Sequence, residues 1–108
     1  MAVAVCGPEG ELISFLRMDA ASPAASLIAQ NKTYTSACDR KSTRETREFM
    51  QGENRPRAYW GDEKITGFGG GLAIIVDGNA LGGIGVSGLS EEEDERIGNA
   101  TIKKINLL

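Results

Sequence analysis

The sequence predicts an α+β fold in which an antiparallel sheet carries helices on its faces. Three observations lead to this class. The chain begins with two apolar runs, 2–6 and 12–17, separated by a Gly-Pro turn cluster. Two further apolar and glycine-rich runs, within 67–78 and 82–88, are joined through Asp77-Gly78, a dipeptide that favours tight hairpins. The chain ends in an amphipathic helical pattern, so hairpins and helices are segregated rather than alternating in βαβ units.

The helices are marked by the residues that begin them. A serine N-cap followed by proline at the first helical position predicts a helix over 23–39. Its apolar stripe is expected at Ala24, Leu27, Ile28, Tyr34, Thr35 and Cys38. A capping box at 42–45 begins a shorter helix that ends near Gly52. Ser90 starts a second capping box and the terminal helix, whose buried stripe is expected at Ile97, Ala100, Thr101, Ile105 and Leu108.

A polar loop, 52–66, lies between the second helix and the glycine-rich hairpin. We expect Tyr59 and Trp60 to fold back from this loop as a lid on the core, with direct stacking on a ligand as the alternative. If 65–68 counts as a short strand, the sheet has five strands and the element order is β-β-α-α-β-β-β-α.

The composition excludes several classes of function. The 108 residues bound a single domain, 1–108, with a formal net charge of −3 and a pI near 4.9. This charge gives no basic footprint for nucleic acid or for an anionic membrane, and no apolar run reaches the ~18 residues of a membrane span. The chain contains no histidine, which excludes His-based general bases, catalytic triads, zinc sites and haem-iron ligands.

The two cysteines and the N-terminus bear on the compartment. Cys6 and Cys38 are too few for a disulfide framework, and we expect them to be reduced, half-buried thiols. The N-terminus lacks the basic segment of a secretory signal. A cytoplasmic location is therefore expected.

Glycine is the most informative residue of the chain, with 14 residues, about twice the usual ~7%. Glycine weakens a strand unless something comes close to its main chain, so a backbone, a helix or a flat ligand is expected to approach the sheet. The stretch 83–88 formally matches G-x-G-x-x-G, but it follows a hairpin and lacks the acid about 20 residues on that a dinucleotide site requires. The stretch 67–71 lacks the phosphate-binding lysine of a P-loop. A binding scaffold is favoured over an enzyme.

The glycine pattern resembles a known family. The triple glycine at 69–71, Asp77-Gly78, the run Gly-Gly-Ile-Gly-Val-Ser-Gly at 82–88 and the following Glu93-Asp94 are similar to the GlcG/HbpS-like family. This domain also forms the C-terminal part of PduO-type cobalamin adenosyltransferases. Three upstream segments fit the family in the same order, which extends the resemblance to residues 2–107, namely 7–12, 17–19 and 31–35.

The resemblance implies a profilin-like α+β fold with a five-stranded antiparallel sheet, and it implies oligomerisation. Some family members bind haem or a related tetrapyrrole, and some sense redox state. Haem-binding members commonly offer histidine to the iron, so haem here would need Met, Tyr or Cys, a partner's ligand, or no axial protein ligand. Family members usually begin with an amphipathic helix ahead of the first strand. This chain starts inside that strand and is expected to lack the helix.

The leading hypothesis is a small cytoplasmic, homo-oligomeric binding or accessory protein. The resemblance implies a haem or corrinoid-type cofactor, in the context of glycolate, propanediol or glycerol utilisation. No catalytic residue and no metal site is predicted. The residues expected to line the ligand cleft are Arg17, Lys32, Tyr34, Gly70, Gly71 and Ser87.

Two alternatives remain open at this stage. The first is an enzyme that acts on a small acid or aldehyde, with Lys32 as base or Schiff-base amine, which requires a desolvated Lys32 with a lowered pKa. The second is a structural oligomer component in which the glycines permit close subunit packing.

Overall fold

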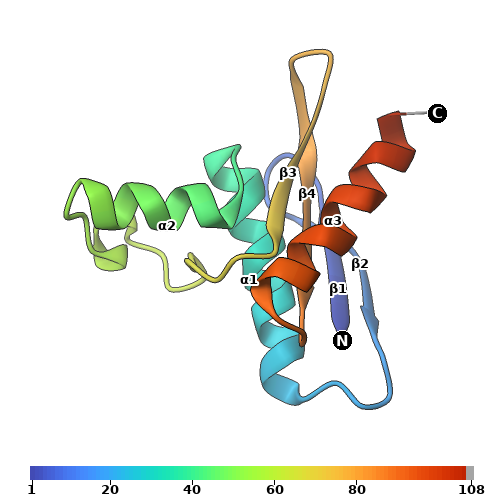
Figure 1. Ribbon diagram of the computed structural model, residues 1–108. Coiled ribbons are helices and arrows are strands. Elements are labelled where there is room, and N and C mark those ends of the chain that lie inside the picture. The colour runs from blue at the N-terminus through green and yellow to red at the C-terminus, as the bar shows by residue number, and fades with distance from the viewer. Residues whose placement is uncertain (107–108) are drawn as a thin grey trace.

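The computed structural model describes residues 1–106 and contains an antiparallel sheet with helices on both faces (Figure 1). The sheet has four strands in the order β2-β1-β4-β3. The strands are β1 (Ala2–Cys6), β2 (Leu12–Arg17), β3 (Gly71–Val76) and β4 (Asn79–Ser87). The helices are α1 (Pro23–Asp39), α2 (Thr43–Gly52) and α3 (Glu91–Asn106), with a short 3-10 turn at Arg57–Trp60.

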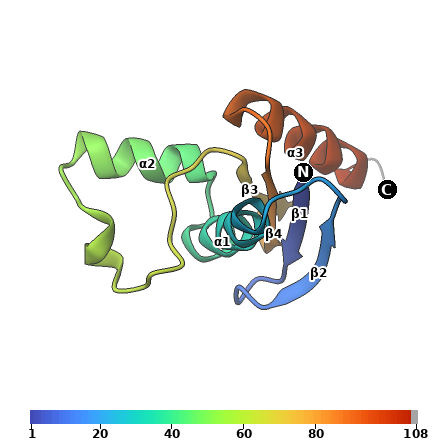
Figure 2. The same cartoon turned by 90° about the horizontal axis from the view of Figure 1, so that it is seen from below.

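The helices form two layers around the sheet. Helix α1 packs on β4, β1 and β3, and α3 packs on the opposite face against β4 and β3 (Figure 2). Helix α2 extends sideways from the body, together with the loop that carries the 3-10 turn (Figures 1 and 2). Among residues 1–106, no helix combines the length and the apolar character that crossing a membrane requires.

The α+β class is confirmed, but the five-stranded count and the element order are not. Residues 65–68 run without strand pairing, so the order is β-β-α-α-β-β-α in the described chain. Two backbone N–H groups there bond to side chains instead. The Thr66 N–H donates to Thr35 Oγ1 at 3.0 Å, and the Phe68 N–H donates to Thr66 Oγ1 at 3.3 Å. The sequence of residues 65–68 did not reveal that these side chains would bond to the backbone.

The local start and turn signals are confirmed. Ser22 Oγ accepts the Ala25 N–H at 3.1 Å, and the capping box of Ser42 is complete in both directions. Helices α1 and α2 end at Asp39 and Gly52, as expected. The Asp77-Gly78 turn has left-handed φ angles of 51° and 79°, which suit a tight hairpin.

The main chain of α1 is what approaches the glycine-rich strands. A Cβ at Gly85 would lie 2.2 Å from the carbonyl oxygen of Ala29, and one at Gly83 would lie 2.7 Å from that of Thr33. The neighbouring strand β1 offers only small side chains to the same face, all buried: Ala2, Ala4 and Cys6. The sequence predicted that a backbone, a helix or a flat ligand would approach these glycines. In the structure, helix α1 fills the space above Gly83 and Gly85.

The apolar stripe predicted for residues 23–39 is wrong in several positions. Leu27 is 59% exposed, and Ala24 and Cys38 are exposed as well. The buried residues of α1 are short or polar: Ala25, Ala29, Lys32, Thr33, Thr35, Ser36 and Ala37. A helix this close to a sheet leaves no room for leucine between them, so the larger apolar side chains turn outward.

The opposite face of the sheet holds the larger apolar core. Leu72, Ile74, Ile84 and Val86 form it, and Ile97, Ile102 and Ile105 of α3 pack against it. Ala100 is exposed rather than buried, and Leu108 lies outside the described residues.

The predicted aromatic lid covers α2 rather than the core. Trp60 packs edge-on against Phe49, with ring centroids 6.0 Å apart, and its Nε1 donates to Asp39 Oδ1 at 3.4 Å. Tyr59 is exposed. Cys6 is buried, Cys38 is exposed, and both are free thiols.

Candidate functional site

Two cavities flank helix α1. Residues two positions apart on a helix point about 200° apart, so Lys32 and Tyr34 leave α1 on opposite sides. The Lys32 cavity holds about 260 Å³ and is lined by Ile28, Lys32, Phe68, Ser87, Gly88, Leu89, Glu91 and Asp94. The Tyr34 cavity holds about 290 Å³ and is lined by Cys6, Gly10, Leu12, Leu27, Gln30, Asn31, Thr33, Tyr34 and Lys64.

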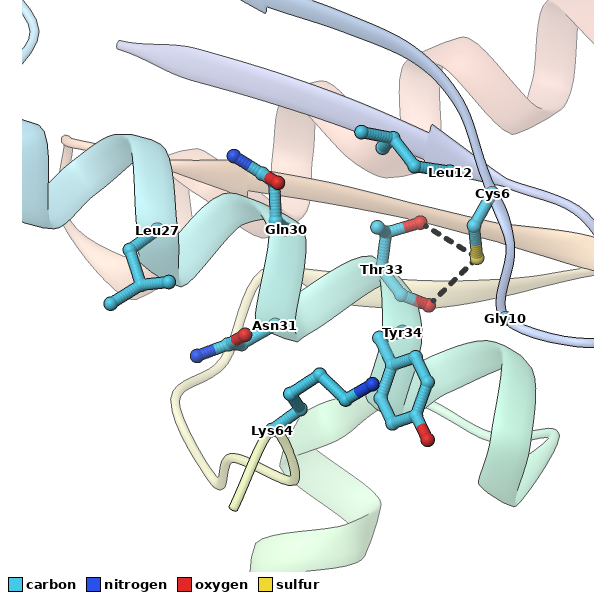
Figure 3. Close-up of a pocket in the computed structure, with 9 residues that line it drawn as sticks. All are labelled: Cys6, Gly10, Leu12, Leu27, Gln30, Asn31, Thr33, Tyr34 and Lys64. Carbon is cyan, nitrogen blue, oxygen red and sulfur yellow. Dashed lines mark hydrogen bonds between the residues drawn. The ribbon is translucent and has the colours of Figure 1, made fainter. Parts of the chain in front are cut away.

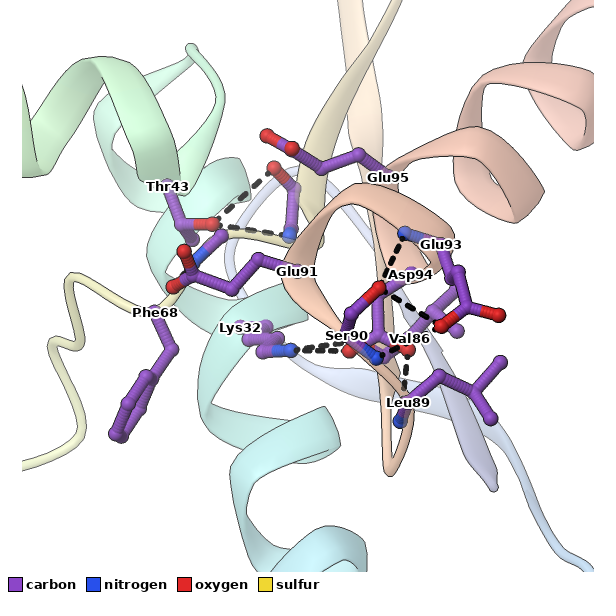
Figure 4. Close-up of polar contacts among 12 residues, drawn as sticks. Lys32, Thr43, Phe68, Val86, Leu89, Ser90, Glu91, Glu93, Asp94 and Glu95 are labelled. Carbon is purple, nitrogen blue, oxygen red and sulfur yellow. Dashed lines mark hydrogen bonds and ion pairs between the residues drawn. The ribbon is translucent and has the colours of Figure 1, made fainter.

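The amine of Lys32 makes two buried polar contacts, which Figure 4 shows. Its Nζ donates to the carbonyl oxygen of Val86 at 2.7 Å and to Asp94 Oδ2 at 3.2 Å. The Lys32 side chain is only 3% exposed, and that of Asp94 only 2%. Asp94 Oδ1 accepts the Leu89 N–H at 3.3 Å, which fixes the carboxylate at the start of α3.

Burial lowers the pKa of Lys32 from its ordinary value of 10.5, because removal from water penalises the charged amine. The carboxylate of Asp94 opposes this shift, and those of Glu91 and Glu95 oppose it less. The amine therefore holds its proton less tightly than an exposed lysine does.

Gly70 makes room for this amine. A Cβ at Gly70 would lie 2.7 Å from Lys32 Nζ and 2.6 Å from the Val86 carbonyl oxygen, and the residue has a left-handed φ of 120°. The carbonyl oxygen of Gly70 accepts the Val86 N–H at 3.0 Å. Gly70 therefore leaves space for the amine, but it does not itself line the Lys32 cavity.

Ser87 and Gly71, also predicted as cleft residues, have different positions. Ser87 is buried and lines the Lys32 cavity. Gly71 lines neither cavity, because the carbonyl oxygen of Lys32 and a methyl group of Thr43 occupy the space above it, 2.6 and 2.5 Å from where a Cβ would stand. The expectation that Gly71 faces a ligand is corrected on this ground.

Ion pairs between α2 and α3 border the Lys32 cavity. Glu91 Oε1 accepts from Arg47 Nη1 at 2.7 Å and from the Gly69 N–H at 2.8 Å. These two bonds, with Arg47 as the larger cause, lower the pKa of Glu91. Arg44 forms a bidentate pair with Glu95, with both distances 2.8 Å. Within residues 1–106, no group of three or more acidic, Cys or His side chains is placed to hold a metal ion.

The Tyr34 cavity lies on the other side of α1 (Figure 3). The Tyr34 hydroxyl donates to Asp62 Oδ2, and Lys64 Nζ lies 4.2 Å from the centre of the Tyr34 ring. Cys6 Sγ donates to the Thr33 carbonyl oxygen and accepts from Thr33 Oγ1, both at 3.2 Å. These contacts tie the loop after α2 and strand β1 to the same turn of α1.

Two protonation states in this cavity follow from its contacts. The hydrogen bond to Asp62 raises the pKa of Tyr34, so the side chain remains a neutral phenol. Burial raises the pKa of Cys6, so its sulfur remains a thiol. The rim carries exposed apolar residues, since Leu12 is 52% and Leu27 is 59% exposed.

Arg17 lines neither cavity. It pairs with Ala2, which pairs with Ser87, so Arg17 lies in the same row of the sheet as Ser87 but two strands away. Its Nε donates to the carbonyl oxygen of Ala21 at 3.2 Å. The structure therefore brings Lys32, Gly70 and Ser87 together and places Tyr34 and Arg17 elsewhere.

Asp94, the buried partner of Lys32, is missing from the residues predicted from sequence. A signal for it exists, because Asp94 lies three residues before Ile97 on the buried stripe of α3. An acid on a buried helical stripe requires a cationic partner or several donors. Lys32 carries the same signal, since it continues the buried stripe of Ala25 and Ala29 on α1.

The donor set does not fit axial coordination of haem iron. The chain has no histidine, and the groups lining the two cavities that could replace it are engaged: Cys6 with Thr33, Tyr34 with Asp62, and Lys32 with Asp94. Met18 lines neither cavity. The exposed leucines and polar groups of the Tyr34 cavity fit the face and the acidic edge of a planar ring.

The chain matches a family model described as haem degrading protein HbpS-like over residues 1–103. Protein GlcG of Escherichia coli strain K12 is 33% identical over 87 residues, which cover 81% of this chain and 63% of GlcG. The chain thus spans less than two thirds of that relative. Corrinoid adenosyltransferase PduO of Salmonella typhimurium is 34% identical over 96 residues, covering 84% of this chain and 28% of PduO.

Solved structures share the whole architecture. PduOC, solved in complex with haem, superposes with a TM-score of 0.89 at 30% identity over 97% of this chain and 78% of its own. Protein ORFY of Klebsiella pneumoniae gives a TM-score of 0.89 at 25% identity over 99% and 75%. HbpS gives a TM-score of 0.85 at 25% identity over 96% and 72%.

Proposed function

Because this chain belongs to the HbpS-like family, whose model matches residues 1–103, we propose that it is a binding or accessory protein for a tetrapyrrole or corrinoid-type ring. The observation that carries the proposal is the Tyr34 cavity, in which exposed leucines border a hollow that also holds an ammonium group and two side-chain amides. The ring is held by its face and edge, with no axial ligand from this chain.

The apolar rim provides the surface for the face of the ring. The hollow of about 290 Å³ is just below the ~300–1,000 Å³ usual for small-molecule sites, so it accepts an edge of the ring while the rest lies across Leu12 and Leu27. Full burial of an exposed leucine side chain contributes about 1.5–3 kcal/mol. Two leucines therefore supply an appreciable share of the binding free energy.

The polar groups of the Tyr34 cavity suit the acidic edge of such a ring. Lys64 offers an ammonium group beside the Tyr34 ring, and Gln30 and Asn31 offer amide donors from α1. Lysine binds carboxylates as a mobile point charge, which tolerates a ligand at a surface. The Lys32 cavity is less suited, since Asp94 and Glu91 line it and oppose an anionic substituent.

Self-association and cellular context form part of the same proposal. Strand β2 lies at the sheet edge with Ile13, Phe15 and Leu16 exposed, a surface that favours pairing with a second copy. We place the homo-oligomer in the cytoplasm, in a glycolate, propanediol or glycerol utilisation context. The relationship to a corrinoid adenosyltransferase supports the propanediol and glycerol versions.

Titration with haem and with iron-free protoporphyrin tests the binding function, followed by absorbance and by quenching of Trp60 fluorescence. The wild-type protein is expected to bind both rings with dissociation constants within about threefold, because the iron gains no protein ligand. Leu27→Asp is expected to weaken both by at least about tenfold, the equivalent of one buried leucine. Leu89→Asp is the matched control, since Leu89 is 46% exposed and lines the Lys32 cavity instead.

Three results would contradict parts of this proposal. No spectral change with either ring at micromolar concentration would remove the binding function. A much tighter complex with haem than with the iron-free ring would reveal an axial ligand. Weaker binding in Leu89→Asp but not in Leu27→Asp would move the ring to the Lys32 cavity.

A further inference from the structure

The Lys32 cavity contains an amine that the proposed ring-binding function does not use. Lys32 and Asp94 both line the cavity, the Lys32 side chain is 3% exposed, and its Nζ lies 3.2 Å from a carboxylate oxygen of Asp94. The remaining lining combines apolar groups, Ile28 and Leu89 among them, with Ser87 and Glu91. A desolvated amine is the nucleophile that Schiff-base chemistry uses, and the neighbouring carboxylate can take up the proton that the amine must lose.

We propose that the Lys32 cavity binds a small, uncharged aldehyde and that Lys32 Nζ captures it reversibly as an iminium ion. The hydrocarbon end of the aldehyde lies against Ile28 and Leu89. The hydroxyl of Ser87 donates to the carbonyl oxygen.

The step balances with groups that the cavity already holds. The Lys32 ammonium gives a proton to Asp94 Oδ2, and the free electron pair of Nζ forms a bond to the carbonyl carbon as the C=O π bond breaks. The nitrogen, now cationic, loses one of its two remaining protons to the oxygen, which becomes the hydroxyl of a carbinolamine. That hydroxyl then leaves as water with the proton held by Asp94. The product is an iminium ion that pairs with the Asp94 carboxylate, and the sum is ammonium plus aldehyde giving iminium plus water.

The charges around the cavity select a neutral substrate over an anionic one. Lys32 faces three carboxylates of α3, those of Asp94, Glu91 and Glu95, and the two glutamates are paired with Arg47 and Arg44. The single cation within the cavity is already neutralised by Asp94. A second carboxylate beside Asp94 would be repelled at short range and only weakly screened by salt. The acid version of the enzyme hypothesis is therefore set aside in favour of the aldehyde.

The lowered pKa of Lys32 supports the proposed reaction in addition to the geometry. An ordinary lysine is almost wholly protonated near neutral pH and therefore reacts slowly with aldehydes. Each unit by which the pKa falls raises the neutral fraction about tenfold. Gly70 adds to the case, because any side chain there would displace the amine from its present position.

Reductive trapping tests the proposal on the full chain. The native protein is treated with propanal and cyanoborohydride near neutral pH, and the modified lysines are located by peptide mass spectrometry over time. Exposed Lys103 and Lys104 are internal controls in the same sample. Lys32 is expected to gain a propyl group at least about tenfold faster than these residues, and glyoxylate, an aldehyde that carries a carboxylate, is expected to lose that preference.

A second variant separates chemistry from packing. Lys32→Arg keeps the positive charge beside Asp94 but cannot form an imine, so the fast site is expected to disappear while the slow sites remain. The proposal is overturned if Lys103 and Lys104 react while Lys32 stays unmodified in the native protein and reacts only after denaturation. It is also overturned if glyoxylate labels Lys32 as fast as propanal does.

Discussion

The two sides of helix α1 differ in how completely their polar groups are bonded and enclosed. On the Lys32 side the amine, the Asp94 carboxylate and the Val86 carbonyl satisfy one another in a nearly dry space. On the Tyr34 side the hydroxyl of Tyr34 bonds to a partly exposed loop, and leucines stand in solvent at the rim. Because α1 packs directly on the sheet, its long side chains project to either side. They therefore line two cavities that differ in their polar groups.

The packing of α1 on strand β4 supports both cavities. Its disruption is expected to have the largest effect on the free energy of unfolding. In Gly85→Val the new Cβ would lie 2.2 Å from the Ala29 carbonyl oxygen and 2.6 Å from the Thr33 nitrogen. Since both are backbone atoms, α1 must move, and we expect a loss of about 4 kcal/mol or more in the free energy of unfolding.

Urea denaturation followed by circular dichroism measures this loss. Gly52→Ala is the matched control, because nothing lies within 4 Å of a Cβ at that position. The control is expected to change the free energy of unfolding by less than about 0.5 kcal/mol. A Gly85→Val protein as stable as the control would show that α1 does not rest on the strand.

The next largest effect is expected on the enclosed side. Asp94→Ala leaves the Lys32 ammonium buried without its counter-charge, which costs about 3–5 kcal/mol in comparable cases. The double variant Lys32→Met/Asp94→Leu removes both charges and is expected to be more stable than Asp94→Ala alone.

Thermal and urea unfolding of the two variants decide this point. If Asp94→Ala were nearly as stable as the wild type, water would reach the amine and the enclosed character of this side would be lost. If the double variant were the less stable of the two, the pair would be a net source of stability.

The smallest expected effect is on how the free energy of unfolding depends on pH, which differs between the Lys32 side and the Tyr34 side. The pKa of Lys32 is lowered from 10.5, so the folded state binds this proton less tightly than the unfolded state and stability rises with pH toward 10.5. The pKa of Tyr34 is raised from 10, so its contribution is complete below pH 10 and is lost as pH rises further. At alkaline pH, Lys32 therefore increases the stability of the fold as pH rises, whereas Tyr34 decreases it.

Variants separate these two contributions when urea midpoints are measured across the alkaline range. The Lys32→Met/Asp94→Leu protein is expected to lack the rise and keep the loss above pH 10. Asp62→Asn removes the main cause of the Tyr34 shift, so it is expected to keep the rise and weaken the loss. Identical profiles for the wild type and both variants would show that neither group titrates differently on folding.

The parts of the fold that were predicted correctly depend on residues close together in the chain. Ser22, the capping boxes and Asp77-Gly78 act within four residues of themselves, so their patterns predict the ends of α1 and α2 and the β3–β4 turn. The strand expected at 65–68 and the leucine stripe of α1 depend on distant contacts. Thr35 satisfies the backbone at Thr66 from 31 residues away, and this contact decides against a strand.

For the candidate site, the sequence alone determined which residue types are present and where they lie along the chain. It determined a chain without histidine, a set of glycines that only a close neighbour could justify, and the positions of Lys32 and Asp94 within two helical segments. The tertiary structure alone decided that the close neighbour is α1. It joined Lys32 to Asp94 across 62 residues and put Tyr34 and Arg17 outside that cavity. The physical reason is that charge, size and capping are properties of single residues, whereas burial and pairing exist only once distant segments have come together.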